Sequence, residues 1–149
     1  MIVNLALACL MVGLTVVIHF VGLLILMWVL RNRRHHFRAH ESAIGQGAAL
    51  VCVVLGLVAI HTVEVWLYAL MYLQIRALPD LESALYFSTT SFTTIGYGDV
   101  VLDKGWRLFG AVEGANGLLL FGWSTAFLIS VTSRIRTLEH DWLEPEEKR

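Results

Sequence analysis

Three long apolar runs constrain the fold of this chain more than any other feature. They extend over residues Ile2 to Leu30, Ala48 to Leu73 and Trp106 to Thr132. A helix of about 20 apolar residues crosses the hydrocarbon core of a bilayer, and each run is longer than that. The first run is too long for a cleaved signal peptide, and its basic residues follow the apolar stretch instead of preceding it. The sequence therefore predicts an all-α membrane protein with three transmembrane helices.

The composition agrees with a membrane protein. Only 15% of the 149 residues are charged, whereas soluble domains carry about 25%. The net charge of −1 argues against a partner nucleic acid. Cys9 and Cys52 lie inside apolar runs, so we expect small buried side chains and not a disulfide.

The basic residues predict the orientation of the helices. They cluster after the first and third runs, and the basic side of a membrane protein is normally cytoplasmic. We expect the N-terminus outside, a basic cytoplasmic linker at 31–47, an outer segment at 74–105 and a short cytoplasmic tail at 137–149. His36 and His40 in the linker could bind a metal, but a lipid-facing basic patch is the preferred interpretation. The compact chain suggests a prokaryotic plasma membrane.

A short helix is predicted within the outer segment. Residues 81–92 are mostly apolar but too few to span a membrane. Asp80 is a good N-cap, and Glu82 falls in the first turn, where an acidic side chain is favoured. We expect this helix to enter the membrane and return. Irregular backbone at that depth must be buried in protein or line water.

Such backbone follows at residues 93–100, "TTIGYGDV", which we call the glycine loop. Gly96 and Gly98 can adopt positive φ without steric cost. Alternating residues of positive φ would turn successive carbonyls to one side, where they could bind a dehydrated cation. Tyr97 could brace the loop with its ring in a wall and its hydroxyl bonded, and Asp99 would attract cations. One loop cannot surround an ion, so several copies must meet around an axis.

The motif "TTIGYGD", between a half-spanning helix and a spanning helix, resembles the selectivity filter of potassium channels. The resemblance covers residues 48–136 and implies an outer helix at 48–73, a pore helix at 81–92, a filter at 94–98 and an inner helix at 106–132. It implies a homotetramer in membrane lipid, in which four loops replace the hydration shell of K⁺. The implied ligands are the carbonyls of Thr94, Ile95, Gly96 and Tyr97 with the Thr94 hydroxyl, and Gly98 completes the outer mouth. No organic cofactor and no enzymatic activity are expected.

The resemblance also assigns roles in the last span. Gly117 matches a hinge glycine, and Gly122 follows Phe121 as a family glycine does. Thr125, Ile129 and Ser133 would line an inner vestibule, with Ile129 as a hydrophobic constriction. Ordinary helix packing is an equally good explanation for these last three residues.

The sequence departs from some bacterial relatives next to the glycine loop. Those relatives carry a glutamate in the pore helix that bonds the filter aspartate, and Thr90 stands at that position here. Tyr86 occupies the place of an aromatic residue that can also bond this aspartate. We therefore expect Tyr86 to reach Asp99 and the loop to be braced differently.

Polar residues within the spans suggest a buried network. His61 and Glu64 share a helix face, as do Glu113 and Asn116. Because intramembrane ionisable residues are costly and normally face protein, these four are predicted to form one network behind the loop that could reach Ser88 or Thr90. The network is either a structural clamp or a proton-sensitive brace on the loop.

His19 is the lone ionisable residue of the first span. It is expected to be a packing histidine with its hydrogen bonds satisfied, not part of a site.

Two other functions remain open from the sequence. One is a less selective cation channel, against which Tyr97 argues. The other is a non-conducting membrane protein, with a metal or proton site on His61, Glu64 and Glu113 or with a role as an interaction subunit.

No span carries regularly spaced arginines, so no voltage sensor is expected. The 17 residues at 133–149 are too few for a ligand-binding domain.

Overall fold

The computed structural model describes residues 2–33 and 43–134, which form four α-helices. These are α1 (Ile2–Arg33), α2 (Ala43–Gln74), α3 (Leu81–Phe92) and α4 (Arg107–Arg134). All but α3 are long and apolar enough to cross a membrane. The described chain is therefore an all-α, multi-pass integral membrane protein. Most of the predicted basic linker and the whole tail, including His36 and His40, lie outside the described residues.

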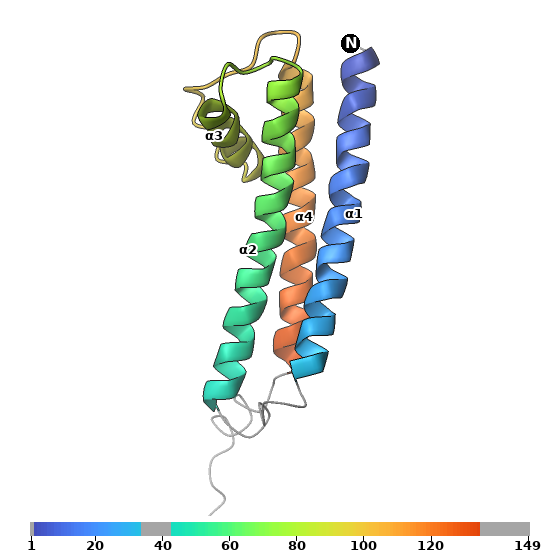
Figure 1. The fold of residues 1–149 in the computed structure, drawn as a ribbon, viewed down its shortest axis with the longest axis vertical. Helices are drawn as coiled ribbons and strands as arrows, with labels where there is room; N and C mark the ends of the chain where they lie inside the picture. The colour runs from blue at the N-terminus through green and yellow to red at the C-terminus, as the bar shows by residue number, and fades with distance from the viewer. Residues whose placement is uncertain (1, 34–42, 135–149) are drawn as a thin grey trace, which may run out of the picture.

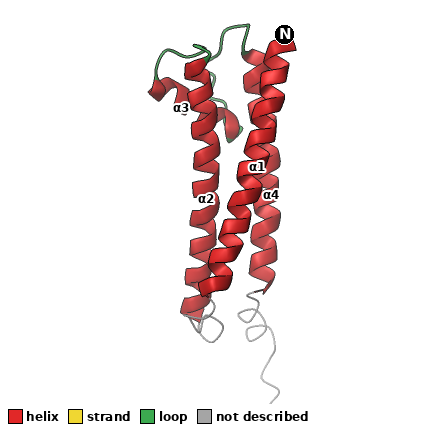
Figure 2. Cartoon of the chain, turned by 45° about the vertical axis from the view of Figure 1, so that its right-hand side comes forward, coloured by secondary structure: helices red, strands yellow, loops and turns green. Residues whose placement is uncertain are grey.

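The three long helices run side by side, and α3 packs against α2 and α4 at one end of the bundle (Figure 1). The N-terminus lies at that same end. In the turned view, α1 lies beside both α2 and α4 (Figure 2). The direction of the chain thus reverses from α1 to α2 and again from α2 to α4, so α4 runs parallel to α1.

The ends of the spans differ slightly from the sequence-based bounds. The second helix begins at Ala43 and not at Ala48, so its first turn includes residues assigned to the linker. Helix α4 begins one residue later than predicted and continues to Arg134. Small and polar residues at 43–47 interrupt the apolar run but do not stop the helix.

One stripe of α1 faces the bundle. Its buried side chains recur every three or four residues, as one face of a helix requires: Ala8, Met11, Thr15, His19, Leu23 and Leu26. Most of the other side chains between residues 5 and 28 are apolar and exposed, which suits contact with lipid. Cys9 lies on that exposed surface and Cys52 is half-buried, so the prediction that both thiols are buried was wrong.

Helices α1 and α2 approach closely at two glycines. A Cβ at Gly22 would come within 2.7 Å of Ile60, and a Cβ at Gly56 within 2.7 Å of Leu26. Small residues of this kind let transmembrane helices pack tightly where lipid removes the hydrophobic drive for association.

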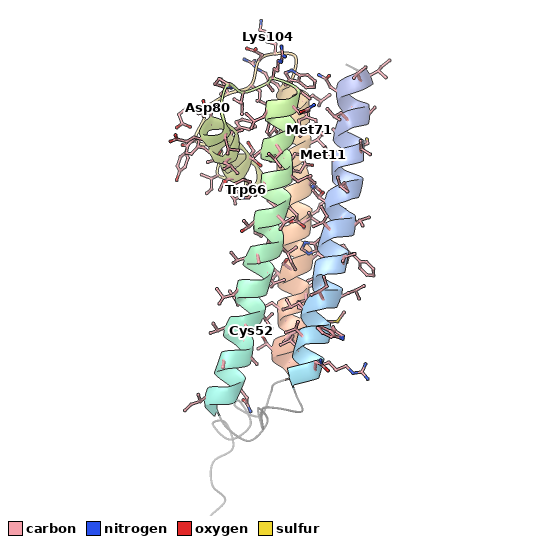
Figure 3. The ribbon with its side chains drawn as sticks, viewed as in Figure 1. Met11, Cys52, Trp66, Met71, Asp80 and Lys104 are labelled. Carbon is pink, nitrogen blue, oxygen red and sulfur yellow. The ribbon has the colours of Figure 1, made fainter. Side chains whose placement is uncertain are left out.

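Helix α3 has the predicted bounds, and its cap explains where it begins. The Asp80 side chain accepts hydrogen bonds from the Ser83 backbone N–H at 2.8 Å and from the Ser83 hydroxyl at 2.9 Å. The N-cap prediction is therefore confirmed. Figure 3 shows Asp80 at the outer end of this helix and Lys104 in the following loop at the same end of the bundle. The other end of α3, at Phe92, is fully buried between α2 and α4.

Candidate ion-conducting loop and its buried support

The glycine loop leaves the buried end of α3 and remains tied to it. The Thr94 N–H donates to the Ser91 carbonyl, and the Gly96 N–H donates to the Thr90 carbonyl, both at 3.0 Å. These bonds fix the start of the loop against the last turn of the helix.

Every second residue of the loop has a left-handed backbone. The φ angles are +61° at Thr94, +54° at Gly96 and +80° at Gly98. Positive φ was predicted at both glycines and is confirmed there. It was not foreseen at Thr94, because a β-branched residue rarely adopts this conformation. Three alternating left-handed residues extend the pattern that turns successive carbonyls to one side.

The carbonyls of the loop are free to bind a ligand. Within residues 2–33 and 43–134, the backbone oxygens of residues 94–97 accept no hydrogen bond. The side chains are open as well: Ile95 is 54% exposed and Tyr97 is 70% exposed. The wall predicted behind the Tyr97 ring is therefore not supplied by the described residues of the same chain. Because residues 94–97 are exposed, these four backbone oxygens are accessible to a ligand.

Asp99, at the outer end of the loop, is held by Tyr86. The Tyr86 hydroxyl donates to Asp99 Oδ2 at 2.7 Å, as the sequence suggested. This hydrogen bond favours the ionised carboxylate and lowers the pKa of Asp99 below its ordinary value. The same bond raises the pKa of Tyr86. Thr90 does not reach Asp99, because its hydroxyl donates to the Phe87 carbonyl of its own helix at 3.0 Å.

Glu113 fastens α3 to the long helices. Its Oε1 accepts from the Ser88 hydroxyl at 2.6 Å, and its Oε2 accepts from the Tyr72 hydroxyl. All three side chains are fully buried. The Glu113 carboxyl group thereby joins α4 to both α3 and α2.

Asn116 belongs to a separate group that joins α4 to α1 and α2. Its amide donates to Thr15 Oγ1 at 2.8 Å and to the Tyr68 hydroxyl at 3.3 Å. The Thr15 hydroxyl donates in turn to backbone carbonyls of its own helix. This group contains no residue that changes charge near neutral pH.

His61 and Glu64 form a third group with two partners that the sequence did not indicate. Glu64 is hydrogen-bonded to His61 Nδ1 at 2.8 Å and to His19 Nδ1 at 2.9 Å. The Ser124 hydroxyl lies 2.9 Å from His61 Nε2 and 3.4 Å from His19 Nε2.

The predicted network is therefore three groups and not one. The extension to Ser88 is present, but Thr90 takes no part. His19 is buried with its hydrogen bonds satisfied, as expected, but its partners are Glu64 and Ser124 of this third group, which the sequence did not indicate. Thr15, Tyr72 and Ser124 were missed because their side chains are common in spans and their partners are 41 to 105 residues away.

Gly117 lies against the end of α3. A Cβ at this position would come within 2.0 Å of the Phe92 carbonyl oxygen, so only glycine allows this approach. A Cβ at Gly122 would meet no atom within 4 Å. Helix α4 continues through both positions without a break. The structure therefore gives Gly117 a packing role, and its hinge role stays a prediction.

The three residues assigned to an inner vestibule share one exposed face of α4. Thr125, Ile129 and Ser133 are all exposed, and Ile129 is 62% exposed. The two hydroxyls donate to carbonyls four residues earlier in the helix, at 2.9 and 2.7 Å. Packing within residues 2–33 and 43–134 therefore does not account for this face.

Comparison with known families agrees with this arrangement. A family model described as "Ion channel" matches residues 48–134, which is more than half of the chain and includes α3, the glycine loop and α4. No curated protein and no solved structure matches the chain significantly. Helix α1 lies outside the matched range. The chain belongs to the ion channel family and is not an enzyme.

Proposed function

We propose that the chain is a potassium-selective channel that works as a homotetramer. K⁺ would cross the membrane down its gradient through four copies of the glycine loop. The Thr94, Ile95, Gly96 and Tyr97 carbonyls and the Thr94 hydroxyl would replace its hydration shell.

The observation that carries this proposal is the backbone of the loop. Residues 94, 96 and 98 have positive φ, and the carbonyls of 94–97 have no partner in the described part of the chain. A dehydrated cation requires several oxygen ligands at once, and one chain supplies a single row of them. Closed cyclic symmetry is the usual way to bring such rows together.

The exposure of the chain supports assembly around an axis. The Tyr97 ring, the Ile95 side chain and the Thr125–Ile129–Ser133 face are all open in one subunit. A pore axis with loops at one end would place the α4 face along the conduction path. Neighbouring subunits would supply the wall that Tyr97 lacks.

The orientation proposed from the basic residues places the loop at the outer membrane surface. The N-terminus lies at the same end as the loop (Figure 1), and the Asn4 side chain bonds the Gly105 carbonyl there. Both would face outward, and the basic ends of α1 and α4 would face the cytoplasm.

Ion flux into liposomes tests the proposal. Purified protein should carry K⁺ but little Na⁺, and Ba²⁺ should block the flux. Replacing Gly96 by alanine should abolish selective flux, because the left-handed backbone at this position disfavours a side chain. Gly13→Ala is the matched control, because a Cβ at Gly13 meets nothing within 4 Å and its φ is ordinary.

The outcomes separate the alternatives. Equal K⁺ and Na⁺ flux would indicate a less selective cation channel. No flux from verified tetramers of the wild type would refute conduction.

A further inference from the structure

Four buried side chains near the middle of the bundle form a closed ring of hydrogen bonds. Glu64 joins the Nδ1 atoms of His19 and His61 through its two oxygens, at 2.9 and 2.8 Å. Ser124 joins the two Nε2 atoms, at 2.9 Å to His61 and 3.4 Å to His19. The ring connects α1, α2 and α4. His19 and Glu64 are fully buried, and His61 and Ser124 are at most 8% exposed.

The number of hydrogen atoms in this ring can be counted. Each of the four bonds requires one hydrogen between its two heavy atoms. Two neutral imidazoles contribute two, the serine hydroxyl contributes one, and an ionised glutamate contributes none. One bond is therefore left without a hydrogen unless the ring binds one further proton.

The additional proton also balances the charge. Glu64 has no lysine or arginine partner among the described residues. A lone carboxylate within an apolar bundle is costly, and one bound proton makes the ring neutral. The net charge of the ring and its number of hydrogen atoms are the same whether the proton resides on a histidine or on Glu64.

The aromatic surroundings suit an imidazolium ion. The His61 ring lies 4.3 Å from the Phe121 ring, and the His19 ring lies 5.2 Å from the Trp123 ring, measured between centroids. Aromatic faces attract cations at such distances.

A proton accounts for the geometry better than a metal ion does. The carboxylate-to-nitrogen separations of 2.8 and 2.9 Å are hydrogen-bond lengths. Two ligands of a tetrahedral zinc ion, each about 2.0–2.1 Å from the metal, would lie about 3.3 Å apart. A divalent ion with one carboxylate would also leave a net positive charge in the apolar interior.

We propose that His19, His61, Glu64 and Ser124 form a site for one proton that fastens α1 to α2 and α4. The attachment of α1 is then pH-dependent. When rising pH removes the proton, the ring has three hydrogens for four bonds and a net negative charge. The longest bond, from Ser124 to His19, opens first, and within the ring it is the bond that joins α4 to α1.

The other titratable groups near the ring are few. On α2, Tyr68 lies one turn from Glu64, and its hydroxyl is bonded to Asn116. The carboxyl group of α4 is Glu113, three turns from Ser124 and bonded to Ser88 and Tyr72. Helix α3 presents only the Phe92 ring to His61, at 6.0 Å. None of these groups shares a hydrogen bond with the ring in the described chain.

Phe92 lies between the proton site and the glycine loop. Its ring contacts both His61 and Phe121, and it lies two residues before Thr94. Opening of the ring would therefore disturb the buried end of α3. If the chain conducts as proposed above, its flux should follow the same pH profile as the attachment of α1.

Nuclear magnetic resonance of the full chain, with ¹⁵N-histidine and ¹³C-glutamate labels, tests the proton count directly. Near neutral pH we expect either one imidazolium shared by His19 and His61 or a protonated Glu64 carboxyl group. Raising the pH should remove this proton while hydrogen exchange along α1, corrected for intrinsic rates, increases at least severalfold. An ionised Glu64 with two neutral rings at pH 6, or stoichiometric bound zinc, would overturn the proposal.

Two variants separate this role from simple packing. His19→Gln retains hydrogen-bonding groups but cannot titrate, so the pH dependence of α1 exchange should disappear. Thr15→Val removes the neutral contact between α1 and Asn116, so it should raise exchange at every pH and leave the pH dependence intact. A wild-type pH profile in His19→Gln would contradict the proposal. Because these measurements do not require conduction, a chain without flux would refute the proposed function alone.

Discussion

At the scale of single residues, two kinds of position control the loop: those with a left-handed backbone and those that hold its ends. Gly96 and Gly98 provide the first, and Thr94 joins them. Gly117 and Tyr86 provide the second, one against the end of α3 and one at Asp99. Each role depends on one backbone conformation or one contact, so each can be tested by one substitution.

Gly117→Ala should destabilise the fold. Its Cβ would lie 2.0 Å from the Phe92 oxygen and 2.8 Å from the Phe92 carbonyl carbon, and neither atom can rotate away. Overpacking of this kind costs about 1–3 kcal/mol. Thermal unfolding in detergent measures the effect. Gly122→Ala is the control, because its Cβ meets no neighbour; equal losses in the two variants would contradict the packing role.

Tyr86→Phe should raise the pKa of Asp99. The hydrogen bond lowers this pKa from the ordinary 3.8, so it stabilises the folded chain above that pH and the benefit disappears as the pH falls through the lowered value. Without the hydroxyl, Asp99 should take up its proton at a higher pH. Titration of a ¹³C-labelled Asp99 carboxyl group measures the shift. Tyr68→Phe removes a hydroxyl that bonds Asn116 and not Asp99, so it should leave the titration unchanged.

At the scale of elements, α3 is held by polar contacts at its buried side. The Ser88 hydroxyl donates to Glu113 at 2.6 Å and lies 3.0 Å from the Val65 carbonyl. The short helix thus contacts α2 and α4 through one side chain. The orientation of the glycine loop depends on this attachment, because the loop begins where the helix ends.

Ser88→Ala should therefore loosen α3. The change leaves the buried Glu113 carboxyl group with one hydroxyl partner fewer, which costs about 1–3 kcal/mol. Ser91→Ala is the same substitution one turn later on the same helix, at a half-buried side chain. Thermal unfolding should show a clear loss for the first variant and a small one for the second. A larger loss from Ser91→Ala would contradict the anchoring role.

The elements themselves were largely predictable from the sequence. Long apolar runs indicate spans, and Asp80 followed by Glu82 fixes the start of α3 because capping is a local interaction. The partners of His19 could not be predicted in the same way. They lie 45 and 105 residues away, and only the relative rotation of three helices brings them together. The positive φ of Thr94 was missed for a different reason, since threonine gives no local signal for it.

At the scale of the whole molecule, the helical bundle includes a helix that the family match does not cover. Residues 48–134 match the ion channel family, yet α1 is packed against α2 and α4 as part of one bundle. Two polar groups, around Asn116 and around Glu64, join α1 to the matched region. The first helix is therefore attached by specific contacts and not by apolar packing alone.

The proposed pore predicts that the purified protein has the mass of four chains. The open loop, the open Tyr97 ring and the exposed α4 face require neighbours. Light scattering of the purified chain, corrected for detergent, should give about four times the 16.7 kDa of one chain. A monomer or dimer that retains full flux would contradict the proposed pore.

The most direct test of the central claim is the reversal potential of single channels in a planar bilayer. With K⁺ on both sides at a tenfold gradient and Na⁺ making up the balance, a potassium-selective pore should reverse near the K⁺ equilibrium potential, about 59 mV from zero. Gly13→Ala should give the same value. Reversal near 0 mV would show that the glycine loop does not distinguish K⁺ from Na⁺ and would contradict the account.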